Sequence, residues 1–229
     1  MDRGMHFTRD PTARRSGLLA LLFLTGVAIL SNPTHAQEAA LPPDDSEYII
    51  FIIDTSGSMF NHVWPVMLKK VEETLNLYPK VKGFQVMNDE GVYMFTGDRG
   101  KWIPDTPAQR RTVVERLRTW NAFSNSSPIE GIVEAIRTYH DTNKKISLYV
   151  FGDEFTGPSI DSVVKGVDLI NREDETGERR VRIHAIGFPL RPDAPQYTST
   201  RFATLMRILC QRNGGTFVSL DEPERSRTR

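Results

Sequence analysis

Residues 48–58 read YIIFIIDTSGS, and this stretch decides the fold. Its first six residues are continuously apolar, without the alternation of a strand that has one face in water. Such a run is typical of a central parallel strand whose two faces are both covered. The apolar run ends abruptly at Asp54. We therefore expect a buried strand that leads directly into a polar loop.

Helix and strand patterns alternate along the chain that follows. Helical stripes are predicted at residues 63–78, 107–117, 128–136, 160–170 and 202–209, and strands at 83–88, 92–96, 146–151, 181–187 and 216–220. Residues 83–88 and 92–96 suggest a hairpin around the turn at 89–91. The alternation predicts an α/β domain, a doubly wound and mostly parallel sheet flanked by helices, with one antiparallel edge hairpin.

Composition limits the class of protein. Of 229 residues, 39% are hydrophobic and 25% charged, which suits one globular domain or two small ones. Basic and acidic residues number 29 each, so the bulk charge gives no support for nucleic-acid binding. The single cysteine, Cys210, excludes an internal disulfide and a multi-cysteine zinc site. Stability must therefore come from a packed core.

The first 36 residues are typical of a secretory signal peptide. Arg14 and Arg15 precede an uncharged, mostly apolar run at residues 17–30, and Thr34 and Ala36 are small residues that suit signal peptidase. The run is shorter than the roughly 20 apolar residues of a membrane span. We expect cleavage after Ala36 and a secreted or periplasmic protein without a stable membrane span. An uncleaved N-terminal anchor is the alternative.

These patterns divide the chain into four parts. We expect a signal peptide at residues 1–36, a linker at 37–46, one α/β domain at 47–220 and a disordered tail at 221–229. The tail is charged and lacks an apolar period, so it offers no face to bury.

Three oxygen donors stand at alternate positions on the loop after the first strand. Asp54, Ser56 and Ser58 converge if Gly57 permits a sharp turn. Carboxylate and hydroxyl oxygens are hard ligands that suit Mg²⁺, Ca²⁺ or Mn²⁺ better than Zn²⁺ or copper. Three donors are too few for six-coordination, so we expect neighbouring loops to contribute. Capping of the next helix by Asp54 or Ser56 is the simpler alternative.

Two further loops offer such donors at the expected ends of strands and starts of helices. Ser126 and Ser127 precede Pro128 at a helix start, and Asp153 follows the strand at residues 146–151. Parallel strands end at one edge of a sheet, which is where ligands of such folds bind. A serine before proline is also a common helix cap, and an aspartate beside Gly152 also suits a turn.

Residues 47–220 resemble the von Willebrand factor type A (VWA) domain and its metal-ion-dependent adhesion site (MIDAS). The loop at residues 54–58 resembles the family's Asp-x-Ser-x-Ser signature. Ser127 stands where the family has threonine. Asp153 stands near the family's last aspartate, in the order Phe-Gly-Asp-Glu rather than Thr-Asp-Gly. The resemblance implies a metal site formed by Asp54, Ser56, Ser58, Ser127 and Asp153, with Ser126 as the alternative to Ser127.

The resemblance also implies a mechanism of binding. In that family the hydroxyls contact the ion directly, some of the carboxylates act through water, and the ion keeps one open position. An acidic side chain of a partner protein fills that position. We therefore expect an exported binding module whose cation is Mg²⁺, with Mn²⁺ or Ca²⁺ as alternatives, and no enzymatic activity.

A hydrolase or phosphoryl-transfer enzyme with Asp54 as nucleophile is the alternative function. That chemistry needs a second acid or base nearby and a lysine to neutralise phosphate, and the sequence around Asp54 offers neither. Ser58 also lacks the Gly-x-Ser-x-Gly elbow of many acyl-transfer enzymes. The sequence thus favours binding over catalysis.

Overall fold

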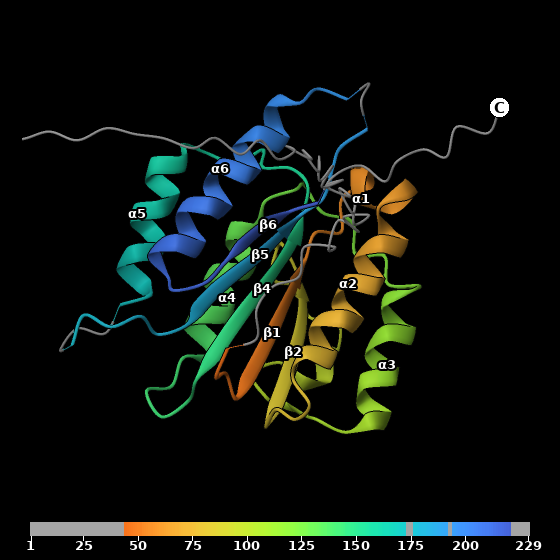
Figure 1. The fold of residues 1–229 in the computed structure, drawn as a ribbon, viewed down its shortest axis with the longest axis vertical. Coiled ribbons are helices and arrows are strands. Elements are labelled where there is room, and N and C mark those ends of the chain that lie inside the picture. Colours follow the sequence, from red (N-terminus) through yellow and green to blue (C-terminus); the bar gives the residue numbers. More distant parts are fainter. Residues whose placement is uncertain (1–43, 173–175, 192–193, 221–229) are drawn as a thin grey trace, which may run out of the picture. The chain divides into compact units, whose positions relative to one another are not determined.

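The computed structural model describes residues 44–172, 176–191 and 194–220, which Figure 1 draws in colour. The predicted signal peptide, most of the predicted linker and the predicted tail lie outside the described residues. The chain divides into two units, residues 1–37 and 38–229, and every described residue belongs to the second unit.

A six-stranded sheet forms the centre of the second unit, in the order β3-β2-β1-β4-β5-β6. The strands are β1 (Tyr48–Ile53), β2 (Gly83–Asn88), β3 (Ile103–Pro104), β4 (Ile146–Gly152), β5 (Arg182–Gly187) and β6 (Phe217–Ser219). All neighbouring strands are parallel except β2 and β3. The predicted α/β class, with a mostly parallel sheet and one antiparallel edge, is confirmed.

The first strand lies where its apolar run predicts. β1 pairs in parallel with β2 on one side and β4 on the other, and its residues from Ile49 to Ile53 are fully buried. Ile49 and Phe51 pack into the core on one face of the sheet, and Ile50 and Ile52 into the core on the other. Because both faces are covered, the strand needs no polar alternation.

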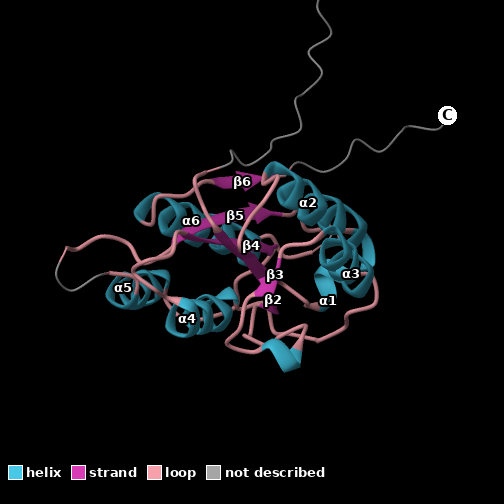
Figure 2. Cartoon of the chain, turned by 90° about the horizontal axis from the view of Figure 1, so that it is seen from below, coloured by secondary structure: helices cyan, strands magenta, loops and turns pink. Residues whose placement is uncertain are grey.

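Helices cover both faces of the sheet, as Figure 2 shows. One face carries α1 (Gly57–His62), α2 (Trp64–Leu77) and α3 (Pro107–Leu117), and the other carries α4 (Pro128–Tyr139), α5 (Ile160–Ile170) and α6 (Tyr197–Arg212). A 3-10 turn, η1 (Thr96–Asp98), precedes β3. Within the described ranges, no helix combines the length and the apolar character that a bilayer crossing requires.

The antiparallel edge lies further along the chain than the predicted hairpin. Residues 92–96 form no strand, and a single bridge joins Met87 to Tyr93. The side-chain Oδ1 of Asn88 accepts hydrogen bonds from the amides of Glu90 and Val92, which closes the turn tightly. The chain then turns through η1, and the strand that pairs with the start of β2 is β3.

Asp44 anchors the segment before β1 to the face of the sheet that α2 covers. Its carboxylate accepts hydrogen bonds from the hydroxyls of Tyr78 at 2.9 Å and Ser147 at 2.7 Å, and contacts His184 Nε2 at 3.0 Å. The amide of Thr216 donates to His184 Nδ1, so Nε2 of the neutral ring carries the proton that faces Asp44. Burial raises the pKa of Asp44, but the hydrogen bonds, that from His184 foremost, hold it well below its usual range.

Replacing Asp44 with alanine should destabilise the domain. The variant leaves the hydroxyls of Tyr78 and Ser147 and the His184 ring without their shared acceptor, so we expect the free energy of unfolding to fall by about 2–4 kcal/mol. Urea denaturation followed by circular dichroism measures the change. Asp45→Ala is the matched control, because its solvent-screened ion pairs contribute little. Equal losses in the two variants would argue against an anchoring role.

Candidate metal-binding site

Three buried aspartates lie where neighbouring parallel strands end. Asp54 follows β1, Asp89 follows β2 and Asp153 follows β4. In the register of the sheet, Ile53 pairs with Asn88 on one side and Phe151 on the other, so the three strand ends meet at one edge. Asp54 is 2% exposed, and Asp89 and Asp153 are 0% exposed.

Hydrogen bonds join four of the five predicted ligands. Asp54 Oδ1 accepts from the Ser56 amide at 2.8 Å, which folds the loop after β1 onto itself. The hydroxyls of Ser56 and Ser58 are 3.0 Å apart, and Ser58 Oγ donates to Asp153 Oδ1 at 3.1 Å. The loop after β1 is thus connected directly to the loop after β4.

The fifth predicted ligand, Ser127, turns its hydroxyl toward the first turn of α4. Ser127 Oγ donates to Glu130 Oε2 at 2.7 Å, while the Ser127 amide donates to Asp89 Oδ2 at 3.1 Å. Ser126 is 4% exposed, and its φ of 54° is a left-handed conformation that is uncommon for residues other than glycine. Its carbonyl accepts from the amide of Thr156 at 3.2 Å. The backbone of this loop therefore adjoins the other loops, although the Ser127 hydroxyl bonds to its own helix.

At the strand ends, two buried carboxylate oxygens receive no hydrogen bond from an amide or a hydroxyl. They are Asp54 Oδ2 and Asp153 Oδ2, and the two carboxyls lie close enough to share a proton. Most buried polar atoms in proteins have a partner, and a buried carboxylate without one binds a proton or a cation instead. These two oxygens are the strongest indication of a ligand at the strand ends.

Burial raises the pKa values of all three aspartates, and repulsion by the other two carboxylates adds to the rise at Asp54. Burial, followed by the charges of Asp89 and Asp153, raises the pKa of Asp54 well above its ordinary value. Burial raises the pKa of Asp153 to about 7, although the hydrogen bond from Ser58 opposes the rise. Burial also raises the pKa of Asp89. The cluster therefore holds protons near neutral pH when no cation neutralises it, and cation binding would release them.

The donor set fits a hard cation, and it needs the hydroxyls. In the described part of the chain, no group of three or more His, Cys, Asp or Glu side chains is arranged to hold a metal ion. A cation beside Asp54 and Asp153 would therefore also need the oxygens of Ser56 and Ser58. Carboxylates, hydroxyls and water are the ligands that Mg²⁺, Mn²⁺ and Ca²⁺ favour.

Asp89 was not among the predicted site residues. Its sequence context predicted the turn of a hairpin, whereas the side chain is buried between the loops after β1 and before α4. A signal was present, since Asp89 follows its strand as directly as Asp54 and Asp153 follow theirs.

Two glycines allow the loops to approach each other closely. A Cβ atom at Gly152 would lie 2.9 Å from the ring of Phe202 and 3.3 Å from the Cβ of Asp54. A Cβ atom at Gly131 would lie 3.0 Å from the carbonyl oxygen of Asp89. Neither glycine has a positive φ, so both are required for space rather than for backbone conformation.

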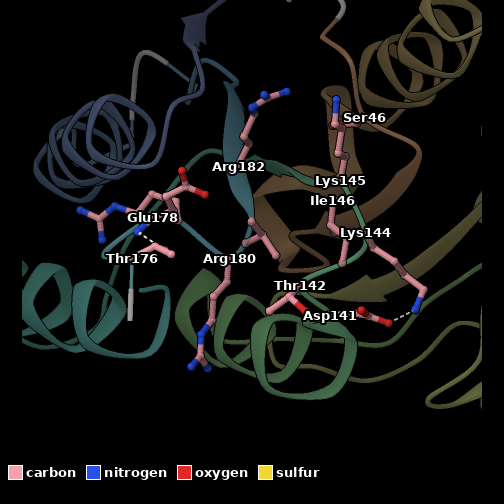
Figure 3. A pocket seen from close by; sticks show the side chains of 12 residues that line it. Ser46, Asp141, Thr142, Lys144, Lys145, Ile146, Thr176, Glu178, Arg180 and Arg182 are labelled. Carbon is pink, nitrogen blue, oxygen red and sulfur yellow. Dashed lines mark hydrogen bonds and ion pairs between the residues drawn. The ribbon is translucent and has the colours of Figure 1, made fainter. Parts of the chain in front are cut away.

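A separate hollow of about 770 Å³ lies at the other end of the sheet, near the starts of β4 and β5. Figure 3 shows its lining, where Lys144 pairs with Asp141 and the side chains of Arg180 and Arg182 point away from each other. Its charged groups do not converge as those at the strand ends do.

Known structures share this fold at low sequence identity. No family model and no curated protein matches the sequence. A von Willebrand factor type A protein from Catenulispora acidiphila aligns with a TM-score of 0.58 and 14% identity, over 78% of this chain and 39% of that one. The open form of the pilus adhesin SpaC from Lactobacillus rhamnosus GG aligns with a TM-score of 0.51 and 12% identity, over 81% and 29% of the two chains.

The SpRpn10 VWA domain aligns with a TM-score of 0.52 and 12% identity, over 79% of this chain and 90% of that one. This chain thus spans about two fifths of the C. acidiphila protein and under a third of the adhesin, but nearly all of the SpRpn10 domain. At such identities the likeness concerns the fold alone, and the described residues adopt a VWA-like fold.

The metal-free domain should become less stable as the pH rises through 7. The folded-state pKa of Asp153, about 7, lies above the ordinary value of 3.8, so the folded state binds more protons than the unfolded state between these values. Stability is therefore greatest at the acid end of this window and falls with a slope of at most about 1.4 kcal/mol per pH unit for one proton.

Thermal melts in chelator between pH 5.5 and 8.5 measure this slope. Asp153→Asn, which mimics the protonated carboxyl, should flatten it. Asp105→Asn should keep it, because the hydrogen bond from Arg110 lowers the pKa of Asp105 and leaves it ionised throughout. An unchanged slope in Asp153→Asn would contradict the assignment.

Proposed function

We propose that this domain binds a hard divalent cation and uses it to hold an acidic side chain of another protein. The ligands are Asp54, Ser56, Ser58, Asp153 and Ser127, with Ser126 as the alternative to Ser127, and Mg²⁺ is the main candidate ahead of Mn²⁺ and Ca²⁺. One observation carries the proposal: Asp54 Oδ2 and Asp153 Oδ2 are buried without a hydrogen bond, and the hydroxyls of Ser56 and Ser58 form a chain to Asp153.

The charge of the cation would replace the protons that the carboxyls hold. Asp54 and Asp153 would supply the negative charge, and Ser56 and Ser58, whose hydroxyls are 3.0 Å apart, would supply neutral oxygens. Ser127 contributes its hydroxyl only after Oγ leaves Glu130, whereas Ser126 is not bound by this constraint. When bound, the ion supplies an electrophilic centre that attracts an anionic oxygen.

The site opens to solvent on the side of α1, which suits capture of a group from another molecule. Asp54 and Ser56 are buried, but Ser58 is half-buried and Gly57 is exposed. A partner carboxylate approaching from this side meets the proposed cation beside Ser58. Neutral hydroxyl ligands leave part of the charge of the ion uncompensated, so an acidic side chain is the favoured partner group.

A binding role for the domain is favoured over an enzyme in which Asp54 acts as the nucleophile. A nucleophilic carboxylate must reach its substrate in the ionised form, whereas Asp54 is 2% exposed and its pKa is raised by burial and by Asp89 and Asp153. One structural neighbour is by name a pilus adhesin, which supports a role in protein binding outside the cytoplasm. Together with the predicted signal peptide, this likeness supports export.

Cation-dependent stability tests the proposal. Addition of Mg²⁺ or Mn²⁺ at about 100 times the dissociation constant should stabilise the folded domain by about 2.7 kcal/mol, or roughly 5–10 °C in Tm, relative to chelator. Asp54→Ala should abolish the shift whatever its own Tm. Asp161→Ala, at a residue whose side chain is 79% exposed on α5, should keep it. The same shift in all three proteins, or in none, would refute the proposed site.

A second measurement separates binding from chemistry. Purified domain assayed with phosphate monoesters and carboxylic esters in Mg²⁺ should show no turnover above a chelated control. Turnover that disappears in Asp54→Ala would instead support the enzyme with Asp54 as nucleophile.

A further inference from the structure

The carboxylate of Asp89 contacts the backbone of two loops at once. Its Oδ1 accepts a hydrogen bond from the amide of Thr55 at 3.3 Å, in the loop that bears Ser56 and Ser58. Its Oδ2 accepts from the amide of Ser127 at 3.1 Å, in the loop before α4. One fully buried side chain thus bridges two segments that are far apart in sequence.

The main chain of Asp89 is held as firmly as its side chain. Its amide donates to the carbonyl of Ile53 at 3.0 Å, and its carbonyl accepts from the amide of Gly131 at 2.7 Å. The neighbouring Asn88 side chain donates to the hydroxyl of Thr55 at 3.3 Å. The end of β1 and the first turns of α4 are therefore tied to the same residue.

The role of Asp89 differs from that of the two aspartates beside it. Asp54 and Asp153 each have a buried oxygen that receives no hydrogen bond, whereas both carboxylate oxygens of Asp89 accept from backbone amides. A carboxylate engaged in this way is suited to hold loops rather than to ligate an ion. Such outer partners orient the ligands of metal sites.

We propose that Asp89 is a positioning residue that sets the separation of the loop at residues 54–58 from the loop at 124–127, and thereby the cation affinity of the site. The part of this inference that concerns cation affinity rests on the proposed function. The part that concerns the position of the two loops rests on the hydrogen bonds of Asp89 alone.

Asp89→Asn tests the proposal with little change of shape. The amide group of asparagine places a donor against one of the two backbone amides, so one loop loses its partner. We expect the dissociation constant of Mn²⁺, measured by calorimetry on the folded domain, to rise about 10–100-fold. We also expect faster hydrogen exchange in chelator at the amide of Thr55 or Ser127.

Two further variants separate position from charge and from general destabilisation. Gly131→Ala keeps the charge of Asp89 but puts a Cβ atom 2.7 Å from the carbonyl oxygen of Asn88 and 3.0 Å from that of Asp89, so it should also weaken Mn²⁺ binding. Asp105→Asn is the matched control: its side chain is only 5% exposed, and its carboxylate likewise accepts from a backbone amide, that of Val81 at 3.0 Å, and binds Arg110. It should leave both the Mn²⁺ affinity and the two exchange rates unchanged.

The outcomes are distinct. Weaker Mn²⁺ binding in Asp89→Asn and Gly131→Ala, with normal binding in Asp105→Asn, supports the proposal. Unchanged affinity in Asp89→Asn, or weakening in that variant alone without faster exchange, overturns it. If the wild-type domain binds no Mn²⁺, the proposed function fails. The hydrogen-exchange rates then decide whether Asp89 holds the loops. Faster exchange in Asp89→Asn supports that role, and unchanged exchange overturns it.

Discussion

The burial of negative charge at the ends of parallel strands is the constraint on which the rest of this domain depends. β1 is covered on both faces, so the residue directly after it is still largely shielded from water. Asp54 occupies that position, and Asp89 and Asp153 stand at the corresponding positions beside it. Three carboxyls so placed repel one another, and the cluster needs protons or a cation to be stable.

Another aspartate of this fold has its pKa shifted in the opposite direction. Asp44 is also partly buried, but two hydroxyls and His184 surround it, and these donors hold its pKa well below the ordinary range. Asp54 and Asp153 each keep an oxygen that receives no hydrogen bond, and their pKa values are raised. The first arrangement fastens a segment to the sheet, and the second leaves binding capacity for a ligand.

Close approach of the loops is what turns separate strand ends into one site. Gly152 lets the end of β4 lie against Asp54, and Gly131 lets α4 lie against the carbonyl of Asp89. The carboxylate of Asp89 then connects the two loops through their amides. The cation site that we propose thus depends on packing and backbone hydrogen bonds as much as on its ligands.

The sequence by itself determined the features that arise from local patterns. A short continuous apolar run that ends in a polar loop is typical of a strand buried on both faces, and the alternate oxygens at Asp54, Ser56 and Ser58 follow from one short loop. Only the tertiary structure decided that Ser127 turns its hydroxyl to Glu130, that Asp89 bridges two loops and that the antiparallel edge is β3. Each of these depends on which atoms meet across the fold, and residue type and spacing do not specify such long-range contacts.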